Sequence, residues 1–447
     1  MPRRFYLATL GCPKNEVDSA KLAGRLVSDG YEACGSAAEA DLVVVNTCAF
    51  IEAAREESVE TILELAAARR PGARLAVTGC LAERHGAELA RELPEVDVVA
   101  GFGMDVTPGE SAGSASPVRL RTRAEVPSFD LLELPRPPAE GPWAYVKVAE
   151  GCDRNCGFCA IPSFRGRQRS RPAAAILEEV DALGVKEVVL VAQDLASWGR
   201  DRTARGRGTG EDFVELVEAV AGRVERVRLL YLYPSSLTDR LVDAIVATGV
   251  PYFDLSLQHA SGPHLRRMRR PGSRARFLER IERIRRAAPG AALRSSFILG
   301  YPGETESDHD ELLGFLGEAE LDWAGFFTFS KEEGTHAALL EGQVPPQLAL
   351  ERLKECAELQ DAVTARRRSE LVGTSSTVLV DAPGVARSYR EAPEIDGVVS
   401  VPAELAVGSF CEVAFVDSLG PDLMGEPLAT GQADSGAPAS ARIGAAR

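Results

Sequence analysis

The chain has 447 residues with 51 Lys or Arg and 66 Asp or Glu, so its formal net charge is −15. Apolar residues make up 45% and charged residues 26% of the chain, which excludes a disordered or collagen-like protein and argues against a dedicated nucleic-acid coat. No apolar stretch approaches the ~18 residues of a membrane helix, and the apolar run near the N-terminus is too short for an export signal. We therefore expect a cytoplasmic protein that makes no contact with a membrane.

The first part of the chain alternates short apolar runs with amphipathic helical patterns. The apolar runs have strand length and cover 4–10, 42–46 and 74–79, and the helical patterns cover roughly 16–29, 50–69 and 82–92. Continuous apolar strands that alternate with helices are typical of βαβ units and of a parallel sheet. We predict an N-terminal parallel α/β sheet domain over residues 1–106.

A Pro-, Gly- and Ser-rich segment over 107–140 is interpreted as a linker or irregular connection. A second series of strand patterns follows, over 143–149, 187–192, 226–232, 252–257, 292–299 and 324–329. Helical patterns separate these strands, for example over 173–183 and 211–222, and a long helical pattern over 346–371 closes the series. Six such units predict a partial βα barrel over 141–370.

The pattern changes after this region to short β-rich runs separated by Gly and Pro. We predict a small β-barrel over 371–430 and a disordered tail over 431–447, which is of low complexity. The predicted fold class is therefore α/β in two consecutive domains, followed by an all-β barrel.

Three cysteines lie close together in the sequence, directly after the first predicted barrel strand. Cys152, Cys156 and Cys159, here named the loop triad, have the spacing C-x3-C-x2-C. Three thiolates can hold one four-iron cluster and leave its fourth iron open to a small molecule. The alternatives are buried cysteines or a zinc site, but zinc usually takes four ligands and no fourth Cys or His lies nearby in the sequence. The spacing favours an iron–sulfur cluster.

Three further cysteines are far apart in sequence but share one position relative to the predicted strands. Cys12, Cys48 and Cys80, here named the strand-end triad, each follow one strand of the N-terminal domain. Strand ends of a parallel sheet meet at one edge, where ligands bind, so these thiolates could converge on a second open-site cluster. The alternative is three unrelated buried cysteines. The remaining cysteines lack this placement and are expected to be structural; they are Cys34, Cys356 and Cys411.

Weaker signals lie at other strand ends of the predicted barrel. Gln193 and Asp194 close the second strand, where they could hold a polar ligand, and Gly300 and Gly303 follow the fifth, where glycine would let a planar ligand approach the backbone. Either pair could equally be an ordinary strand-to-helix turn. His259 ends the fourth strand, and a structural role is favoured for it over a place in a cavity.

Two clusters of arginines accompany these signals. One follows the loop triad and contains Arg165, Arg167, Arg169 and Arg171; the other contains Arg266, Arg267, Arg269 and Arg270. The default interpretation of both clusters is a solvated face. The more specific interpretation is a binding site for a ligand carboxylate or an anionic substrate.

These motifs together resemble a known enzyme family. The sequence CDRNCGFC, with Phe158 before its last cysteine, is similar to the signature of radical S-adenosylmethionine enzymes, and the strand-end triad resembles the other half of the methylthiotransferase family. The motifs LGCPKNEVDS, EGCDRNCGFCAIPSFRGRQRSR, VAQDLASWG, YPSSLTD and FSKEEGTHA resemble the bacterial branch that modifies an aspartate of ribosomal protein S-twelve. The resemblance covers residues 1 to about 430.

The resemblance implies an auxiliary-cluster domain, a radical barrel and a C-terminal TRAM β-barrel. It implies two 4Fe-4S clusters, with Cys152, Cys156 and Cys159 holding the one that binds S-adenosylmethionine. Phe158, Gln193, Asp194, Gly300 and Gly303 are then expected to contact that cofactor. The implied reaction removes a hydrogen from the β-carbon of the aspartate by a 5′-deoxyadenosyl radical, and the cluster on Cys12, Cys48 and Cys80 delivers a thiomethyl group. An electron donor is a further implied partner.

Two alternatives stay open at this point. One is a tRNA methylthiotransferase that acts on a modified adenosine with the same clusters, and the other is a non-catalytic iron–sulfur scaffold that binds RNA. Residues 371–430 argue against tRNA as a partner, because they contain two basic side chains, Arg387 and Arg390, against nine acidic ones. An RNA-binding barrel would neutralise phosphates with Lys and Arg, so we expect this barrel to bind a basic protein surface.

Overall fold

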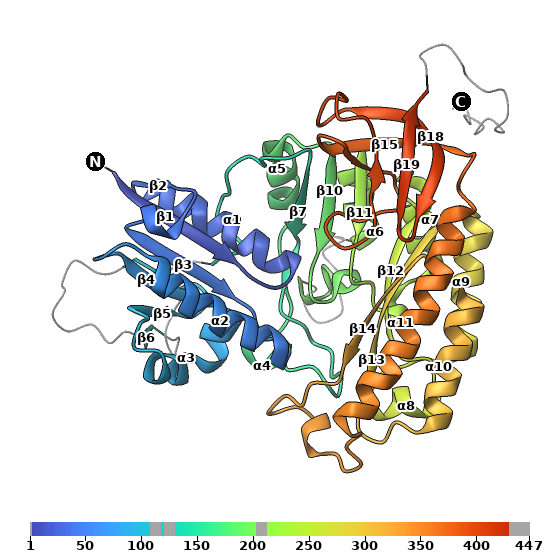
Figure 1. Ribbon diagram of the computed structural model, residues 1–447, viewed down its shortest axis with the longest axis horizontal. Coiled ribbons are helices and arrows are strands. Elements are labelled where there is room, and N and C mark those ends of the chain that lie inside the picture. Colours follow the sequence, from blue (N-terminus) through green and yellow to red (C-terminus); the bar gives the residue numbers. More distant parts are fainter. Residues whose placement is uncertain (1, 108–117, 120–129, 203–211, 429–447) are drawn as a thin grey trace. The chain divides into compact units, whose positions relative to one another are not determined.

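The computed structural model describes residues 2–107, 118–119, 130–202 and 212–428 (Figure 1). The chain forms two compact units, residues 1–364 and 365–447. The predicted N-terminal domain thus falls in the first unit, together with all but the last six residues of the predicted barrel region 141–370. Most of the predicted linker and all of the predicted tail lie outside the described residues. No helix in the described part of the chain is long and apolar enough to cross a membrane; the cytoplasmic location stays a prediction.

The N-terminal part of the first unit is a six-stranded, fully parallel sheet with the strand order β2-β1-β3-β4-β5-β6. Its strands are β1 (Arg3–Thr9), β2 (Tyr31–Ala33), β3 (Leu42–Thr47), β4 (Arg74–Gly79), β5 (Val98–Ala100) and β6 (Val118–Arg119). Its helices are α1 (Pro13–Ser28), α2 (Glu52–Ala68) and α3 (Cys80–Glu92). The predicted parallel α/β sheet is confirmed, although the three-residue strands β2 and β5 were not predicted.

Alternate residues of the central strand serve the two faces of this sheet. Leu42 and Val44 pack in a cluster with Leu22 of α1, whereas Val43 and Val45 pack in a second cluster that includes residues of α2 and α3. Side chains alternate across a strand, and all six residues of β3 are buried. A strand buried on both faces reads as a continuous apolar run, which explains why β3 was recognisable in the sequence.

The second part of the first unit contains six parallel strands in sequence order. Two three-stranded sheets, β11-β10-β7 and β12-β13-β14, are joined by a parallel bridge between Leu232 and Leu255. The strands are β7 (Trp143–Lys147), β10 (Glu187–Val191), β11 (Arg226–Leu229), β12 (Tyr252–Gln258), β13 (Ala292–Leu299) and β14 (Trp323–Thr328). Because β7 and β14 form the two edges, this is a partial βα barrel, as predicted.

Helices cover the outside of these strands (Figure 1). They are α5 (Ala173–Leu183), α6 (Phe213–Ala221), α7 (Asp239–Ala247), α9 (Arg274–Ala287), α10 (Glu306–Ala319) and α11 (Pro346–Ser369), with the short helix α8 (Gly262–Arg267). The short helix α4 (Ile161–Phe164) packs instead against the core of the N-terminal domain. Apolar residues of the helices and strands form one large core cluster, which includes Phe277 of α9 and Phe315 of α10. This core holds the strand ends in place.

The barrel departs from the predicted elements at two strand ends. The predicted strand 143–149 divides into β7 and a short strand β8 (Ala149–Glu150), which pairs antiparallel with β9 (Arg169–Ser170). The predicted strand 226–232 ends at Leu229, because Tyr231 has a φ of +64° and leaves the extended conformation. Both departures occur at the carboxyl ends of strands, where βα folds place their chemistry.

The second unit is a closed five-stranded barrel in the order β15-β16-β17-β19-β18. Its strands are β15 (Ser375–Ala382), β16 (Val385–Arg387), β17 (Val399–Ser400), β18 (Phe410–Leu419) and β19 (Asp422–Pro427). Buried residues such as Val380, Val413 and Phe415 fill its interior. The predicted small β-barrel is confirmed.

Candidate active site

The loop triad lies in the connection between β8 and β9. Gly151 precedes Cys152 with a φ of +76°, and a Cβ there would lie 2.2 Å from the Arg167 carbonyl oxygen. Only glycine fits so close a backbone approach without strain. The Cys152 amide donates to the Gly166 carbonyl at 3.1 Å. The β8–β9 pairing therefore closes the base of the cysteine loop.

Two arginines fix this loop against the barrel. Arg154 forms an ion pair with Asp194 at 2.5 Å and also donates to Ser236 Oγ at 2.6 Å. Arg270 donates to Cys156 Sγ at 3.4 Å. Both guanidinium groups lie about 4 Å from the centroid of the Tyr233 ring. The loop is thus held by side chains from three other segments of the barrel.

The strand-end triad meets at one edge of the N-terminal sheet. Cys12 caps the start of α1 after β1, Cys48 follows β3, and Cys80 is the first residue of α3 after β4. In the strand order these three strands are neighbours. The order 2-1-3-4-5 places a topological switch point between β1 and β3, and ligands of such sheets bind there. The fold therefore brings together three cysteines separated by more than 30 residues each.

Two glycines make room for this convergence. Gly11 has a φ of +93°, and a Cβ there would lie 2.7 Å from Cys48 Cβ. Gly79 has a φ of +92°, and a Cβ there would lie 2.3 Å from Asn46 Oδ1. Each glycine directly precedes a cysteine of the triad. A larger residue would push the neighbouring strand end away from the site.

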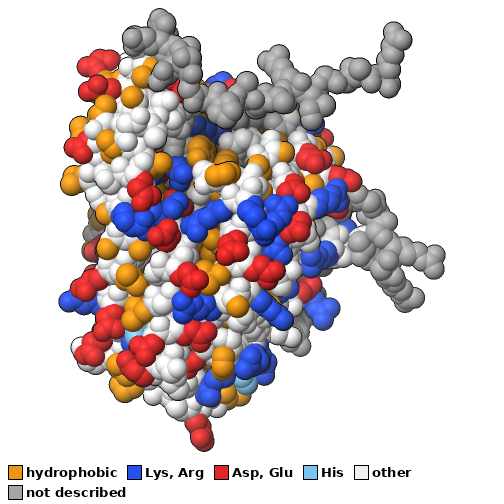
Figure 2. All heavy atoms as spheres, turned by 90° about the vertical axis from the view of Figure 1, so that its right-hand side faces the viewer, with side chains coloured by type: hydrophobic (Ala, Val, Ile, Leu, Met, Phe, Trp, Pro, Cys, Tyr) orange, Lys and Arg blue, Asp and Glu red, His pale blue; other side chains and the backbone are white. Residues whose placement is uncertain are grey.

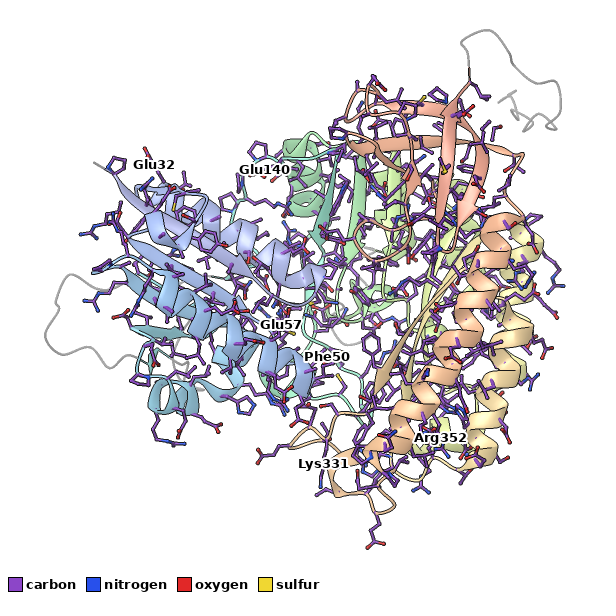
Figure 3. All side chains as sticks on the ribbon, in the orientation of Figure 1. Glu32, Phe50, Glu57, Glu140, Lys331 and Arg352 are labelled. Atoms are coloured by element: carbon purple, nitrogen blue, oxygen red, sulfur yellow. The ribbon has the colours of Figure 1, made fainter. Side chains whose placement is uncertain are left out.

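Asn15 and Ser58 organise the backbone around the strand-end triad. The Asn15 amide donates to the carbonyls of Leu10 at 2.8 Å and Thr47 at 3.0 Å, which ties the end of β1 to the end of β3. The Ser58 hydroxyl exchanges hydrogen bonds with the amide and carbonyl of Cys48. Figure 3 shows Phe50, two residues further on, where the chain passes from β3 toward α2.

Arg165 connects the two triads. It follows Cys159 by six residues in the chain, and its guanidinium donates to Cys80 Sγ at 3.1 Å and to Asn15 Oδ1 at 2.7 Å. The same guanidinium donates to both Glu150 oxygens, at 2.9 and 3.1 Å. Glu150 lies two residues before Cys152. One buried side chain thus links the base of the loop triad to a cysteine of the strand-end triad.

A buried ion network surrounds this arginine. Lys147 forms ion pairs with Asp18 of α1 and with Glu150, the latter at 2.7 Å, and Arg165 also contacts Asp18 at 3.3 Å. Burial opposes ionisation of Glu150, but Arg165 and Lys147 outweigh it, so the pKa of this carboxyl lies well below its usual range. The network holds the N-terminal domain against the first strand of the barrel.

Comparisons with known proteins agree with this architecture. Residues 4–101 match the model of the uncharacterized protein family UPF0004, residues 146–316 the radical SAM superfamily and residues 372–428 the TRAM domain. The ribosomal protein uS12 methylthiotransferase RimO of Moorella thermoacetica is 43% identical, over 90% of this chain and 93% of its own length. The protein of the same name from Sorangium cellulosum is 39% identical, over 99% of this chain and 95% of its own.

The chain belongs to the ribosomal protein uS12 methylthiotransferase family. It is a radical SAM methylthiotransferase, and the family resemblance seen in its motifs is confirmed. The match to the radical SAM superfamily implies one iron–sulfur cluster and S-adenosylmethionine. Among solved structures, the radical SAM methyltransferase TsrM of Kitasatospora setae, with cobalamin and a [4Fe-4S] cluster bound, has a TM-score of 0.48 at 14% identity, over 91% of this chain and 84% of its own.

Burial and neighbouring cations set the pKa values of the thiols in both triads. Burial raises the pKa of Cys48 and of Cys159 to about 12, and that of Cys152 to about 11. Such thiols are protonated at neutral pH until a metal displaces the proton. Burial also opposes ionisation of Cys12, but Lys14 and Arg165 outweigh it and lower the pKa of that thiol. Arginines donate to Cys80 and Cys156, where they would stabilise a thiolate.

A single metal ion fits the cysteines less well. Among the described residues, His259, His264 and Glu304 form a group whose three ligand atoms lie within 4.8 Å of one another. Neither cysteine triad has its three sulfur atoms so close together. Zinc would hold its sulfurs closer than that. Part of the histidine group already has protein contacts, because His259 Nδ1 accepts the Ser261 amide at 3.0 Å and Glu304 accepts Arg352 at 3.0 Å. His259 Nε2 and both ring nitrogens of His264 have no hydrogen-bond partner among the described residues.

The other residues predicted to contact the cofactor stay predictions, and the structure gives several of them protein contacts. Asp194 pairs with Arg154, and Gln193 donates to Glu150 at 2.9 Å. Phe158 is half-buried against the barrel core. Gly300 and Gly303 both have a positive φ, and a Cβ on them would meet Ala349 and Arg267, respectively. Protein packing thus already accounts for glycine at both positions.

The expectation of solvated arginine runs is wrong for three members. Arg165, Arg171 and Arg270 are each at least nine-tenths buried and make hydrogen bonds to protein groups. The other five lie at or near the surface. Sequence reasoning named Arg165 only as a member of an arginine cluster, and it missed Asn15 and the glycines of the site. The signal that could have revealed the glycines is the dipeptide Gly-Cys, which occurs at 11–12, 79–80 and 151–152.

Proposed function

We propose that this chain adds a methylthio group to the β-carbon of an aspartate in ribosomal protein uS12, the small-subunit protein S-twelve. The observation that carries the proposal is the Arg165 bridge, since one buried side chain contacts Cys80 of the strand-end triad and Glu150 at the base of the loop triad. A reaction that needs two cofactors close together fits this arrangement. The relatives that match nearly the whole chain are named for the same substrate.

Two four-iron clusters are part of the proposal. Cys152, Cys156 and Cys159 would hold the cluster that binds S-adenosylmethionine, and Cys12, Cys48 and Cys80 would hold the auxiliary cluster. Each set offers three thiols and so leaves one iron without a protein ligand. When bound, these cofactors supply a radical that removes the hydrogen and a methylated sulfur that replaces it. An external electron donor is required for the cleavage of S-adenosylmethionine.

The protein contributes position and exclusion of water. Cys48, Cys80 and Cys152 are buried, and the ion network of Asp18, Lys147, Glu150 and Arg165 is buried as well. Asn15 and Arg154 fix the backbone and the loop that carry the thiols. A reactive intermediate formed between the two sites would therefore meet ordered side chains, and little bulk water.

A protein substrate fits the charges of the chain better than tRNA does. The second arginine run continues into α9, which could have offered a track for phosphates. However, Arg274, Arg280 and Arg283 are paired with Glu318, Asp239 and Asp243 at distances of 2.6–2.7 Å. Figure 2 shows acidic side chains among the basic ones on that side of the protein. These three ion pairs reduce the attraction of α9 for a polyanion.

Product analysis tests this proposal. The reconstituted full-length enzyme, a reductant and S-adenosylmethionine are incubated with uS12 or with unmodified tRNA, and both are analysed by mass spectrometry. We expect a methylthio group on one aspartate of uS12 and none on tRNA. Modification of tRNA without modification of uS12 would contradict the proposal.

A further inference from the structure

Lys14 is a buried cation beside the strand-end triad. It lies in the first turn of α1, two residues after Cys12, and only 8% of it is exposed. Its Nζ lies 3.4 Å from the centroid of the Tyr231 ring. No carboxylate lies within ion-pair distance of this ammonium among the described residues. Lysine is almost never so deeply buried unless it is paired, so this charge is unusual.

The other buried lysines of the same unit show the usual arrangement. Lys21 forms an ion pair with Glu179 at 3.2 Å, and Lys147 is paired with both Asp18 and Glu150. Arg165, the other cation that faces the strand-end triad, is matched by Glu150 and Asp18. Lys14 therefore stands apart, since its neighbours are the Tyr231 ring and the Cys12 thiol where the other cations have a carboxylate.

The position of Lys14 places this charge between the two halves of the active site. Cys12 of the strand-end triad is close enough to act on it electrostatically, and Tyr231 lies just beyond the carboxyl end of β11 in the barrel. Tyr231 has a φ of +64°, and its amide is held by Asp254 at 2.9 Å. A positive φ in a bulky residue is strained and persists where the surroundings impose it. The Tyr231 ring thus contacts Lys14 although the backbone of Tyr231 is strained.

We propose that Lys14 is the residue that recognises the carboxylate of the substrate aspartate. A carboxylate bound to Nζ would give Lys14 the carboxylate partner that it lacks and would place the β-carbon one bond further, beside Cys12 and at the mouth of the barrel. This inference rests on the proposed function, and it adds a reason for selecting an acidic side chain. Lys14 is a specificity-determining residue in this scheme, because it binds the group next to the reacting carbon.

The test compares two substrates in three enzymes. The substrates are uS12 and its variant with the target aspartate changed to asparagine, which is nearly the same shape but has no charge. The enzymes are the wild type, Lys14→Met and Lys14→Arg. A hydrogen bond to a charged group contributes enough for a discrimination of about 10- to 100-fold, so we expect wild type to prefer aspartate by about that factor in kcat/KM. The preference should vanish in Lys14→Met and return in part in Lys14→Arg.

Readouts other than turnover separate this role from a structural one. Iron content and cleavage of S-adenosylmethionine without substrate should be retained in Lys14→Met, while the KM for uS12 rises. Lys186→Met is the matched control, because Lys186 is exposed, paired with Glu225 and precedes the amino end of β10. If Lys14→Met does not fold, Lys14→Gln replaces it in the same measurements.

Two outcomes would overturn the inference. One is an unchanged preference for aspartate in a Lys14→Met enzyme with normal iron content. The other is loss of iron in both Lys14→Met and Lys14→Gln, which would make Lys14 a support of the strand-end triad. Failure of the proposed function itself looks different, because the wild-type enzyme would then modify neither form of uS12.

Discussion

The two cysteine triads, each proposed to hold an iron–sulfur cluster, are assembled by the fold in different ways. The loop triad is contiguous in sequence, and its shape depends on one connection between β8 and β9 with arginine contacts from the barrel. The strand-end triad is dispersed over about 70 residues, and a parallel sheet brings its members together. The loop triad can therefore be identified from spacing alone. The strand-end triad exists only when the domain is folded.

We predict that the loop triad serves radical formation and the strand-end triad serves methylthio transfer. The largest effect is expected when the loop triad is removed. Changing Cys152, Cys156 and Cys159 together to Ala should abolish reductive cleavage of S-adenosylmethionine, because the open iron that binds this cofactor would be lost. The strand-end cluster should stay, so the iron content should fall by about half. Iron analysis and quantification of 5′-deoxyadenosine check this. Cleavage by the triple variant would show that the loop triad is not the radical site.

Removal of the strand-end triad should separate the two halves of the reaction. We expect the variant with Cys12, Cys48 and Cys80 changed to Ala to form 5′-deoxyadenosine but no methylthiolated uS12. The matched control changes the other cysteines to Ala, namely Cys34, Cys356 and Cys411, and should keep both activities. Multiple turnovers of methylthiolation by the strand-end variant would refute the assignment.

The same contrast explains which strands and which site residues could be predicted from the sequence. Apolar runs such as Leu42–Thr47 and Ala292–Leu299 are long and fully patterned, and they form strands at the predicted positions. The short strand Val98–Ala100 carries too few residues to show a pattern. The six cysteines proposed as cluster ligands could be selected from spacing and strand ends. The contacts of Arg165 could not be predicted in this way, because its partners Asn15 and Cys80 lie 150 and 85 residues away. No pattern in the sequence connects residues so far apart.

The bridge between the triads can be weakened without touching a cysteine. Changing Arg165 to Gln leaves Asp18 and Glu150 buried with less positive charge, and loss of one partner from a buried ion pair costs about 3–5 kcal/mol. We expect a lower urea midpoint for unfolding of the first unit and an altered spectrum of the strand-end cluster. The matched control is Arg167→Gln, at an exposed position of the same loop. Equal midpoints for both variants would contradict the proposed bridge.

The same bridge gives the stability of the enzyme a pH dependence. The pKa of Glu150 is lowered in the folded state because Arg165 and Lys147 outweigh its burial, whereas an unfolded glutamate titrates near about 4.3. Such a group stabilises the fold above its unfolded pKa, and that stability is lost as the pH falls from there toward the folded value. Unfolding midpoints of wild type should therefore decline below about pH 4.3 more steeply than those of Arg165→Gln. Parallel profiles would exclude this contribution.

The smallest effect is expected from charge changes on the second unit. These changes test whether residues outside the two triads also take part in binding uS12. Arg387 and Arg390, the two basic residues of this barrel, are buried, and Arg387 is paired with Asp381. Glu412 and Asp417 of β18 and Glu426 of β19 are exposed. Ala414 pairs with Glu426, so Glu412 and Glu426 lie on the same outward face of neighbouring strands. This face would attract a basic protein and repel a polyanion.

Reversing that charge should weaken binding of uS12 by the full-length enzyme. We expect a loss of about 3- to 10-fold at low salt when Glu412, Asp417 and Glu426 are changed to Lys, because each exposed charge contributes only modestly. The difference should shrink as salt rises, since surface charges are screened beyond about 8 Å at physiological ionic strength. A control with exposed acids of α10 and α11 changed to Lys, at Asp310, Glu318 and Glu351, should bind as wild type does. If both triple variants weaken binding equally, the effect is one of net charge, and the β18–β19 face has no special part in choosing a protein substrate. If the β18–β19 variant alone loses affinity for uS12, recognition extends from the aspartate at the triads to a basic surface of its protein.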